Sequence, residues 1–225
     1  MAARLGLPDE AARRLEALID ALAREPDPHT TVADPVAEHL ADSLSGLEVG
    51  ALRVARRIAD VGAGAGFPGL PLAIALPASR VDLIESRRRK VELITRLASA
   101  AGVENVRAVP TRAEEWAAPG AEGREAYDAV TARAVAPLAV LVEYAAPLLR
   151  VGGALVAWKG GRDAAEEERG ARAARGAGLV PEEIRRVTPF AGARHRHLHL
   201  LLKAGPTPAD LPRRPGAARK RPLGS

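Results

Sequence analysis

The sequence predicts an α/β protein with a mostly parallel sheet, an antiparallel last strand and a small N-terminal helical cap. Three observations support this prediction. From residue 57 onward, short apolar segments alternate with segments of helical periodicity, as in parallel βαβ units. The last two apolar segments have no crossover helix between them, so we expect them to pair antiparallel. Residues 1–50 show helical patterns only.

Two helices are expected in the cap. The first would begin near Pro8-Asp9, and its apolar residues have the i, i+3, i+4, i+7 spacing of an amphipathic helix: Leu15, Leu18, Ile19 and Leu22. The second would begin at Asp34-Pro35, where an N-cap residue precedes a proline. Its expected buried stripe consists of Leu40, Leu44 and Leu47.

The rest of the chain provides the expected sheet and its helices. We predict seven strands, at residues 58–61, 81–85, 106–109, 127–132, 153–158, 184–187 and 198–202. The helices between them are predicted at residues 70–76, 87–101, 138–149 and 164–177. We divide the chain into the cap (1–50), a main domain (51–204) and a C-terminal tail (205–225).

Composition excludes several classes of protein. The chain has 225 residues, of which 47% are hydrophobic, and it has no cysteine. A disulfide framework, a cysteine metal cluster and a cysteine nucleophile are therefore excluded. No apolar run is long enough to cross a membrane, and Met1–Leu5 lacks the apolar core of a signal peptide. We expect a cytoplasmic monomer that binds no membrane and no metal.

Positive charge is concentrated in the tail. Residues 205–225 contain five basic residues and Asp210, a net of +4, which leaves about +1 of the total +5 for the other residues. Such a basic, proline-rich end suggests an anionic partner. A solvated end is the alternative, and the general preference for arginine over lysine indicates a compositional bias that weakens the argument.

A glycine-rich stretch at residues 60–69, D-V-G-A-G-A-G-F-P-G, is the strongest local signal. It follows an apolar strand and precedes a helical segment, so glycines would let the backbone approach a nucleotide-like cofactor. Gly64, Gly66 and Gly69 satisfy the dinucleotide pattern G-x-G-x-x-G, whereas Gly62, Gly64 and Gly66 after Asp60 fit the first motif of methyltransferases that use S-adenosylmethionine (SAM).

Two features favour SAM over a dinucleotide. Asp60 ends the first strand, where dinucleotide folds usually have an apolar residue, and a carboxylate there would attract the cationic methionine end of SAM. The antiparallel pair at the end of the sheet is typical of SAM-dependent folds. Glu85 ends the second strand and is able to accept hydrogen bonds from ribose hydroxyls, but enzymes that use NAD share this feature.

The sequence resembles the bacterial glucose-inhibited division protein B family, also called RsmG, at several places in the same order. The first is D-V-G-A-G-A-G-F-P-G-L-P-L at residues 60–72. The other matching stretches are residues 39–43, 83–90, 111–115, 131–134, 158–160 and 212–216. Near the N-terminus the sequence departs from the family's pattern, at residues 28–30 and at Glu38.

The resemblance implies a Rossmann-like class I SAM-dependent methyltransferase that modifies guanine N7 in 16S ribosomal RNA. Together with the glycine pattern, it predicts these cofactor-binding residues: Asp60, Gly62, Gly64, Gly66, Phe67, Glu85, Ser86, Arg87, Ala113, Glu114 and Arg133. We expect Glu85, Ser86 and Arg87 around the adenosine half, Ala113 and Glu114 at the adenine, and Arg133 closing the pocket.

Basic residues near this site and in the tail are predicted to bind RNA. They are Arg88, Lys159, Arg196, His197, Arg213, Arg214, Arg219, Lys220 and Arg221. His195, His197 and His199 would share one strand face, and we expect them to be exposed or to face RNA rather than to bind a metal. We also expect removal of residues 205–225 to weaken RNA binding and to leave cofactor binding intact.

The residue inventory agrees with methylation at guanine N7. A pyrimidine carbon normally requires a cysteine nucleophile, and amino-group methylation often uses an Asn/Asp-Pro-Pro-aromatic motif; the sequence has neither. Guanine N7 carries a free lone pair, so we expect direct in-line attack without a covalent intermediate or a catalytic acid or base. The alternatives are an NAD(P)-linked oxidoreductase and a non-catalytic RNA-binding module.

Overall fold

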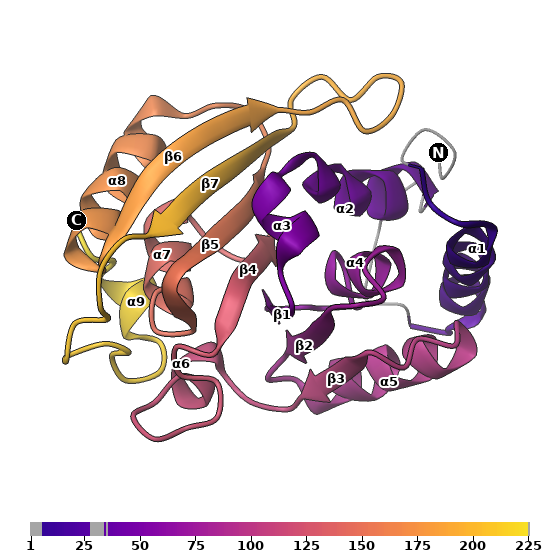
Figure 1. Ribbon diagram of the computed structural model, residues 1–225, viewed down its shortest axis with the longest axis horizontal. Coiled ribbons are helices and arrows are strands. Elements are labelled where there is room, and N and C mark those ends of the chain that lie inside the picture. The colour runs from indigo at the N-terminus through magenta and orange to yellow at the C-terminus, as the bar shows by residue number, and fades with distance from the viewer. Residues whose placement is uncertain (1–5, 28–33, 35, 225) are drawn as a thin grey trace.

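The computed structural model describes residues 6–27, 34 and 36–224, and in this part of the chain seven strands form one sheet (Figure 1). The strands are β1 (Arg57–Val61), β2 (Arg80–Ile84), β3 (Val106–Val109), β4 (Tyr127–Arg133), β5 (Leu149–Lys159), β6 (Leu179–Arg186) and β7 (His197–Lys203). They lie in the order β3-β2-β1-β4-β5-β7-β6. The chain reverses its direction of winding between β1 and β4, so a cleft opens there at the carboxyl ends of the strands.

The predicted mixture of parallel and antiparallel pairing is confirmed. Strands β1 to β5 pair in parallel, and β7 pairs antiparallel with both β5 and β6. Side chains alternate between the two faces of each strand. Ile58 and Val81 therefore join one buried cluster, whereas Ala59 and Ile84 join another.

Helices cover both faces of the sheet. One face packs against α1 (Asp9–Arg24), α4 (Gly69–Ala75) and α5 (Arg88–Ala100). The other packs against α6 (Ala113–Trp116), α7 (Leu138–Ala145), α8 (Ala164–Gly176) and α9 (Ala217–Lys220). In Figure 1, α7 and α8 lie on the side opposite α1 and α5.

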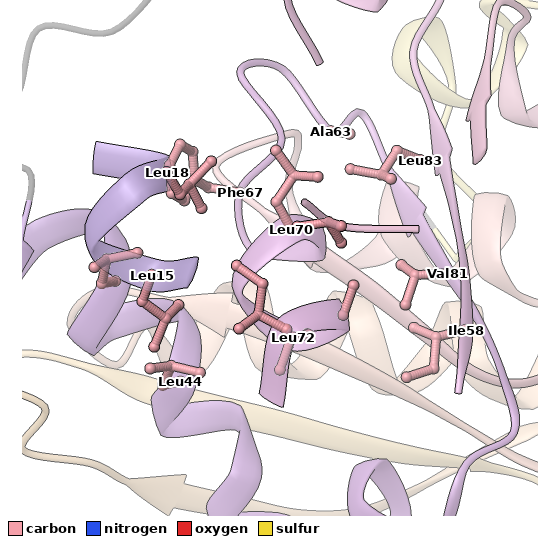
Figure 2. Close-up of a cluster of buried hydrophobic side chains, with 14 of the residues drawn as sticks. Leu15, Leu18, Leu44, Ile58, Ala63, Phe67, Leu70, Leu72, Val81 and Leu83 are labelled. Carbon is pink, nitrogen blue, oxygen red and sulfur yellow. The ribbon is translucent and has the colours of Figure 1, made fainter. Parts of the chain in front are cut away.

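The cap is joined to the sheet by a continuous apolar core. Helix α1 begins after Pro8, as predicted, and buries Leu15 and Leu18 in the same cluster as Leu70 and Leu72 of α4. Figure 2 shows these side chains between α1 and the strands β1 and β2. At the end of α1, Glu25 forms an ion pair with Arg96 of α5 at 2.7 Å.

The second cap helix is divided into short pieces. They are the π-helical segment η2 (Val36–Ala41), α2 (Asp42–Leu44), the 3₁₀ segment η3 (Ser45–Glu48) and α3 (Gly50–Val54). The predicted stripe of Leu40, Leu44 and Leu47 is buried, but Pro35 lies outside the described residues. A Cβ at Gly46 would lie 2.4 Å from the ring of Trp158, so this turn requires glycine to pack against β5.

The predicted helix at residues 138–149 was wrong at its end. Helix α7 stops at Ala145, and Leu149 already begins β5. Pro147 explains the early end, because proline cannot continue a helix. The strand passes through Gly152, which has a φ of +84°, and a Cβ at Gly153 would lie 2.9 Å from the carbonyl oxygen of Asp128.

The sixth strand is longer than predicted, and it begins at Leu179 rather than at residue 184. Pro181 lies inside it, which is compatible with its position at the edge of the sheet because an edge strand leaves half of its N–H groups unpaired. The short helices α3 and α6 were not predicted, because four or five residues show no measurable periodicity.

The C-terminal tail packs against the main domain. Leu211 and Ala218 are each 2% exposed and belong to the cluster that contains α7. Arg213 forms an ion pair with the buried Glu143 of α7 at 2.5 Å. The division of the chain at residues 50 and 204 stays a prediction. Among the described helices, none is both long and apolar enough to span a bilayer.

The packing of α1 yields a stability prediction. Leu18 is fully buried, so Leu18→Ala should lower the free energy of unfolding by about 2–5 kcal/mol, because it removes apolar contacts and leaves a cavity. Urea unfolding followed by circular dichroism measures this change. Val54 is 77% exposed, and Val54→Ala should change stability by less than about 0.5 kcal/mol. Equal effects of the two substitutions would contradict the packing of α1 onto the core.

Candidate functional site

The glycine-rich loop at the end of β1 is shaped by positive φ angles. Gly62, Gly64 and Gly66 have φ values of +68°, +61° and +93°, which L side chains rarely adopt. The backbone nitrogen atoms of Gly62 and Ala63 donate to the carbonyl oxygen of Ile84, at 2.9 and 3.2 Å. A Cβ at Gly62 would lie 2.8 Å from a methyl group of Val135, so a larger residue would not fit beneath that side chain.

Glu85 connects this loop to the loop that follows β2. One carboxylate oxygen accepts a hydrogen bond from the backbone nitrogen of Gly64 at 3.1 Å, and the other accepts from that of Arg87 at 2.8 Å. Each oxygen of an ionised carboxylate has two lone pairs, so capacity remains for a ligand hydroxyl. Ser86 and Arg87 are exposed beside it.

A hollow of about 110 Å³ lies at the carboxyl ends of strands β1 to β4. It is lined by the ends of the strands, the loop after β3, helix α7 and the tail: Val61, Gly62, Ile84, Glu85, Ser86, Thr111, Arg112, Ala113, Glu114, Val135, Tyr144 and Arg219. This position agrees with the general rule that ligands bind outside the carboxyl ends of strands at the switch point of an open α/β sheet.

Ala113 and Glu114 begin the short helix α6 and border the hollow. Glu114 is 8% exposed, and its carboxylate accepts a hydrogen bond from the backbone nitrogen of Gly216 at 3.0 Å. Arg219 donates to the carbonyl oxygen of Val135 at 3.0 Å. Part of the tail therefore borders the hollow, and other parts of it lie on the surface.

Asp60 lies beneath the loop and is fully buried. One carboxylate oxygen accepts from the backbone nitrogen of Gly69 at 3.0 Å, and the other from the hydroxyl of Thr131 at 2.9 Å. Burial raises the pKa of Asp60 to about 7, against the lowering effect of these two hydrogen bonds. A Cβ at Gly69 would lie 2.8 Å from the carboxylate, so glycine is required where α4 begins.

Phe67 packs against the cap. Its ring stacks on that of His39, with centroids 4.5 Å apart and an interplanar angle of 18°. The guanidinium of Arg133 lies 5.8 Å from the Phe67 centroid and donates to the carbonyl oxygen of Glu38 and to the carboxylate of Asp42. Burial, followed by the nearby charge of Arg133, lowers the pKa of His39 to about 4, so this ring is neutral at neutral pH.

The structure divides the predicted cofactor-binding residues into two groups. Those that line the hollow are Gly62, Glu85, Ser86, Ala113 and Glu114. The others do not line it: Asp60, Gly64, Gly66, Phe67, Arg87 and Arg133. The sequence analysis missed Val135 and Tyr144, because each lies in an apolar context without a motif.

The predicted RNA-binding residues also differ in their surroundings. Arg88 pairs with Glu92, Lys159 with Glu166, Arg213 with Glu143, and Arg196 lies 3.5 Å from Asp42. His197 shares a hydrogen bond with the carbonyl oxygen of Gly160, and Arg219 contacts Val135. The side chains of Arg214, Lys220 and Arg221 are exposed.

The three histidines do not share one strand face. His195 precedes β7, whereas His197 and His199 lie two residues apart on it and share a face. His199 is 5% exposed, so the expectation that it is exposed was wrong. The expectation of three alternating histidines on one strand was therefore wrong, because β7 begins at His197, two residues after His195. Among the described residues, no group of three or more potential ligands is arranged to hold a metal.

Comparison with known proteins agrees with this arrangement. The sequence model of the GidB family, described as rRNA small subunit methyltransferase G, matches residues 28–198. A ribosomal RNA small subunit methyltransferase G from Rubrobacter xylanophilus is 45% identical over 189 residues, which cover 83% of this chain and 72% of that protein. The protein of the same name from Deinococcus radiodurans is 44% identical over 196 residues, covering 86% and 76%.

Solved structures share the fold at lower identity. A SAM-dependent O-methyltransferase from Thermotoga maritima has a TM-score of 0.59 and 16% identity, covering 85% of this chain and 72% of that one. The O-methyltransferase TomG from Streptomyces achromogenes, solved in complex with SAM, has a TM-score of 0.56 and 23% identity, covering 88% and 91%.

The strand order, the antiparallel β7 and the glycine loop beside a carboxyl-end hollow give the chain the fold of the class I SAM-dependent methyltransferases. More narrowly, the chain belongs to the GidB family, the rRNA small subunit methyltransferase G family. The predicted family, fold and use of SAM are thereby confirmed, and the oxidoreductase alternative is set aside.

The raised pKa of Asp60 predicts a pH-dependent stability. The folded protein binds this proton more tightly than the unfolded chain, so the stabilisation is largest below the ordinary pKa of 3.8 and declines as the pH rises to about 7. Asp60→Asn keeps an acceptor for Gly69 but does not titrate. The wild-type free energy of unfolding minus that of the variant should therefore fall across this range, by at most about 1.4 kcal/mol per pH unit.

Urea unfolding at half-unit steps from pH 4 to pH 8 measures this difference. Above about pH 7 the difference should become constant, because Asp60 is then ionised in both states. A difference that stays constant or rises between pH 4 and 7 would show that burial does not favour the protonated carboxyl.

Proposed function

We propose that this chain transfers the methyl group of SAM to N7 of a guanine in 16S ribosomal RNA, by direct in-line attack. Membership of the rRNA small subunit methyltransferase G family, matched over residues 28–198, is the observation that carries the proposal. The absence of cysteine from the whole sequence supports the target atom, because it excludes the nucleophile that carbon methylation of pyrimidines normally requires.

The hollow has the features that an adenosine-containing ligand requires. Gly62 lets Val135 pack directly on the glycine loop at the edge of the hollow, and Glu85 offers lone pairs to ribose hydroxyls while it holds both adjoining loops. Ala113 and Glu114 border the hollow where the adenine would lie. We assign to Asp60 an indirect role, since both of its oxygens are occupied in fixing the start of α4 and the end of β4.

SAM supplies a methyl group on a sulfonium that the guanine N7 lone pair is able to attack. N7 carries no proton in neutral guanine, so the protein needs no general base for this step, and we assign no catalytic acid or base. The protein contributes by alignment, which is worth several kcal/mol, on the order of 7–11 in the most favourable intramolecular systems. Positive charge passes to the methylated base, so arginines are better placed on phosphates than against the base.

Phe67, Gly64, Gly66, Ser86, Arg87 and Arg133 remain proposed cofactor-site residues. For Phe67 and Arg133, the packing on His39 and Asp42 favours a role in holding the cap against the cofactor loop. We place the reaction in the cytoplasm, where the small ribosomal subunit is assembled, and propose that the enzyme acts as a monomer.

A methyl-transfer assay tests the proposal directly. Small ribosomal subunits from a strain that lacks this modification should accept one labelled methyl group per particle from SAM, and fully modified subunits should accept none. The labelled base should be a guanine methylated at N7, which makes the RNA chain cleavable by mild reduction followed by aniline. Label on any other atom would refute the proposed target, and wild-type protein that binds SAM but transfers nothing would favour a non-catalytic RNA-binding module.

The exposed charges of the tail predict a change in salt dependence. Arg214 is exposed beside the packed Arg213, so Arg214→Ala should weaken RNA binding and reduce the slope of log K against log salt by about 1, as expected for one lost phosphate contact. Filter binding between 50 and 200 mM salt measures the slope. Arg175→Ala, at an exposed arginine in the last turn of α8, is the charge-matched control and should keep the wild-type slope. Identical slopes for all three proteins would rule out a phosphate contact at Arg214.

A further inference from the structure

The C-terminal segment, residues 211–221, lies beside the hollow rather than apart from it. Its helix α9 contacts α7, and Figure 1 shows it near α6 as well. Leu211 and Ala218 anchor the segment in the apolar cluster of this face. The segment is therefore held at a defined position by buried side chains.

Two hydrogen bonds tie the segment to residues that border the hollow. The backbone nitrogen of Gly216 donates to the carboxylate of Glu114 at 3.0 Å. The guanidinium of Arg219 donates to the carbonyl oxygen of Val135 at 3.0 Å. Val135 in turn covers the backbone of Gly62, so the segment, the loop after β4 and the glycine loop form one continuous wall.

A third contact fixes the segment from behind. Arg213 pairs with Glu143, whose side chain is only 3% exposed, through two hydrogen bonds of 2.7 and 2.5 Å. Arg213 also donates to the carbonyl oxygen of Arg221 at 2.6 Å, which closes the segment on itself. Arg219 is thereby positioned by groups on both sides of it in the sequence.

We propose that this segment is a wall of the cofactor hollow and that Arg219 contacts the adenosine half of bound SAM. The inference rests on the proposed function, and it assigns to Arg219 a role other than the RNA contact expected from the sequence. Arg219 lines the hollow together with Glu85, Ala113 and Tyr144. Its planar guanidinium is suited to lie against a flat heterocycle and to donate hydrogen bonds to ring nitrogens.

Charge and position favour the adenosine half over the methionine half. The methionine half of SAM carries a sulfonium, an ammonium and one carboxylate, a net charge of +1 that disfavours a guanidinium, whereas adenosine is neutral. Gly216, three residues before Arg219, bonds to Glu114 at the end of the hollow formed by α6. With Arg219 in contact with adenosine, removal of residues 205–225 should weaken cofactor binding as well as RNA binding, which differs from the expectation drawn from the sequence.

Calorimetric titration without RNA tests the proposal. The probes are S-adenosylhomocysteine, which contains both halves of the cofactor, and 5′-methylthioadenosine, which lacks the amino-acid group. Arg219→Ala should weaken both by the same factor, about tenfold, as expected for loss of one hydrogen bond to a charged donor. Arg175→Ala should stay within about twofold of wild type, since it removes an exposed arginine elsewhere.

Each outcome bears on one claim. Arg219 is exposed, so its replacement by alanine should shift the thermal midpoint of the ligand-free protein only slightly, through loss of the hydrogen bond to Val135. A weaker affinity with the midpoint kept then reports the role of Arg219 at the hollow rather than misfolding. Unchanged affinity of Arg219→Ala for both probes would overturn the inference and leave the proposed function intact. Weaker binding of S-adenosylhomocysteine alone would overturn the assignment to adenosine. Wild-type protein that binds neither probe would overturn the proposed function itself.

Discussion

The buried carboxyl of Asp60 is the interaction on which the rest of the site depends. It lies at the end of β1, at the switch point of the sheet, and joins the start of α4 to β4 through Gly69 and Thr131. A buried polar group without hydrogen bonds is costly, by about 1–3 kcal/mol for each group left unpaired. Burial raises the pKa of Asp60, but both of its oxygens accept hydrogen bonds. Any other position of the loop would leave one of these buried oxygens unpaired, so the burial fixes the position of the loop.

Glu85 plays the corresponding role one strand further along the sheet, but it faces the hollow. Asp60 fixes the base of the glycine loop, and Glu85 holds its outer part through Gly64. The sequence predicted a cofactor contact for both acids, Asp60 at the methionine end and Glu85 at the ribose, but of the two only Glu85 lines the hollow. The two acids differ in their surroundings: Asp60 is enclosed by α4 and β4, whereas Glu85 lines the hollow.

The cap and the tail complete the site from opposite faces of the sheet. In the cap, His39 stacks on Phe67, and the cap also binds the side chain of Arg133. In the tail, Gly216 and Arg219 form hydrogen bonds on the other side of the hollow. Both terminal segments therefore contribute residues to the surroundings of the hollow. Some residues that the motifs mark as cofactor contacts pack against the cap instead. No glycine motif predicts the wall that the tail forms.

The sequence by itself determined the family, through its resemblance to known members, and the order of the main strands and helices along the chain. These follow from local patterns: alternation of apolar segments, glycines after a strand, and acids at strand ends. Local patterns misplaced the end of α7 and the start of β6, where Pro147 follows the end of a helix and Pro181 lies in an edge strand.

Only the tertiary structure decided which acid faces the hollow, that Phe67 stacks on the cap, and that Arg219 lines the hollow. Each of these depends on contacts between residues far apart in the chain, such as Glu114 with Gly216 and Arg133 with Asp42. A periodic pattern indicates which face of an element is buried, but the partner across that face is set by how the elements pack.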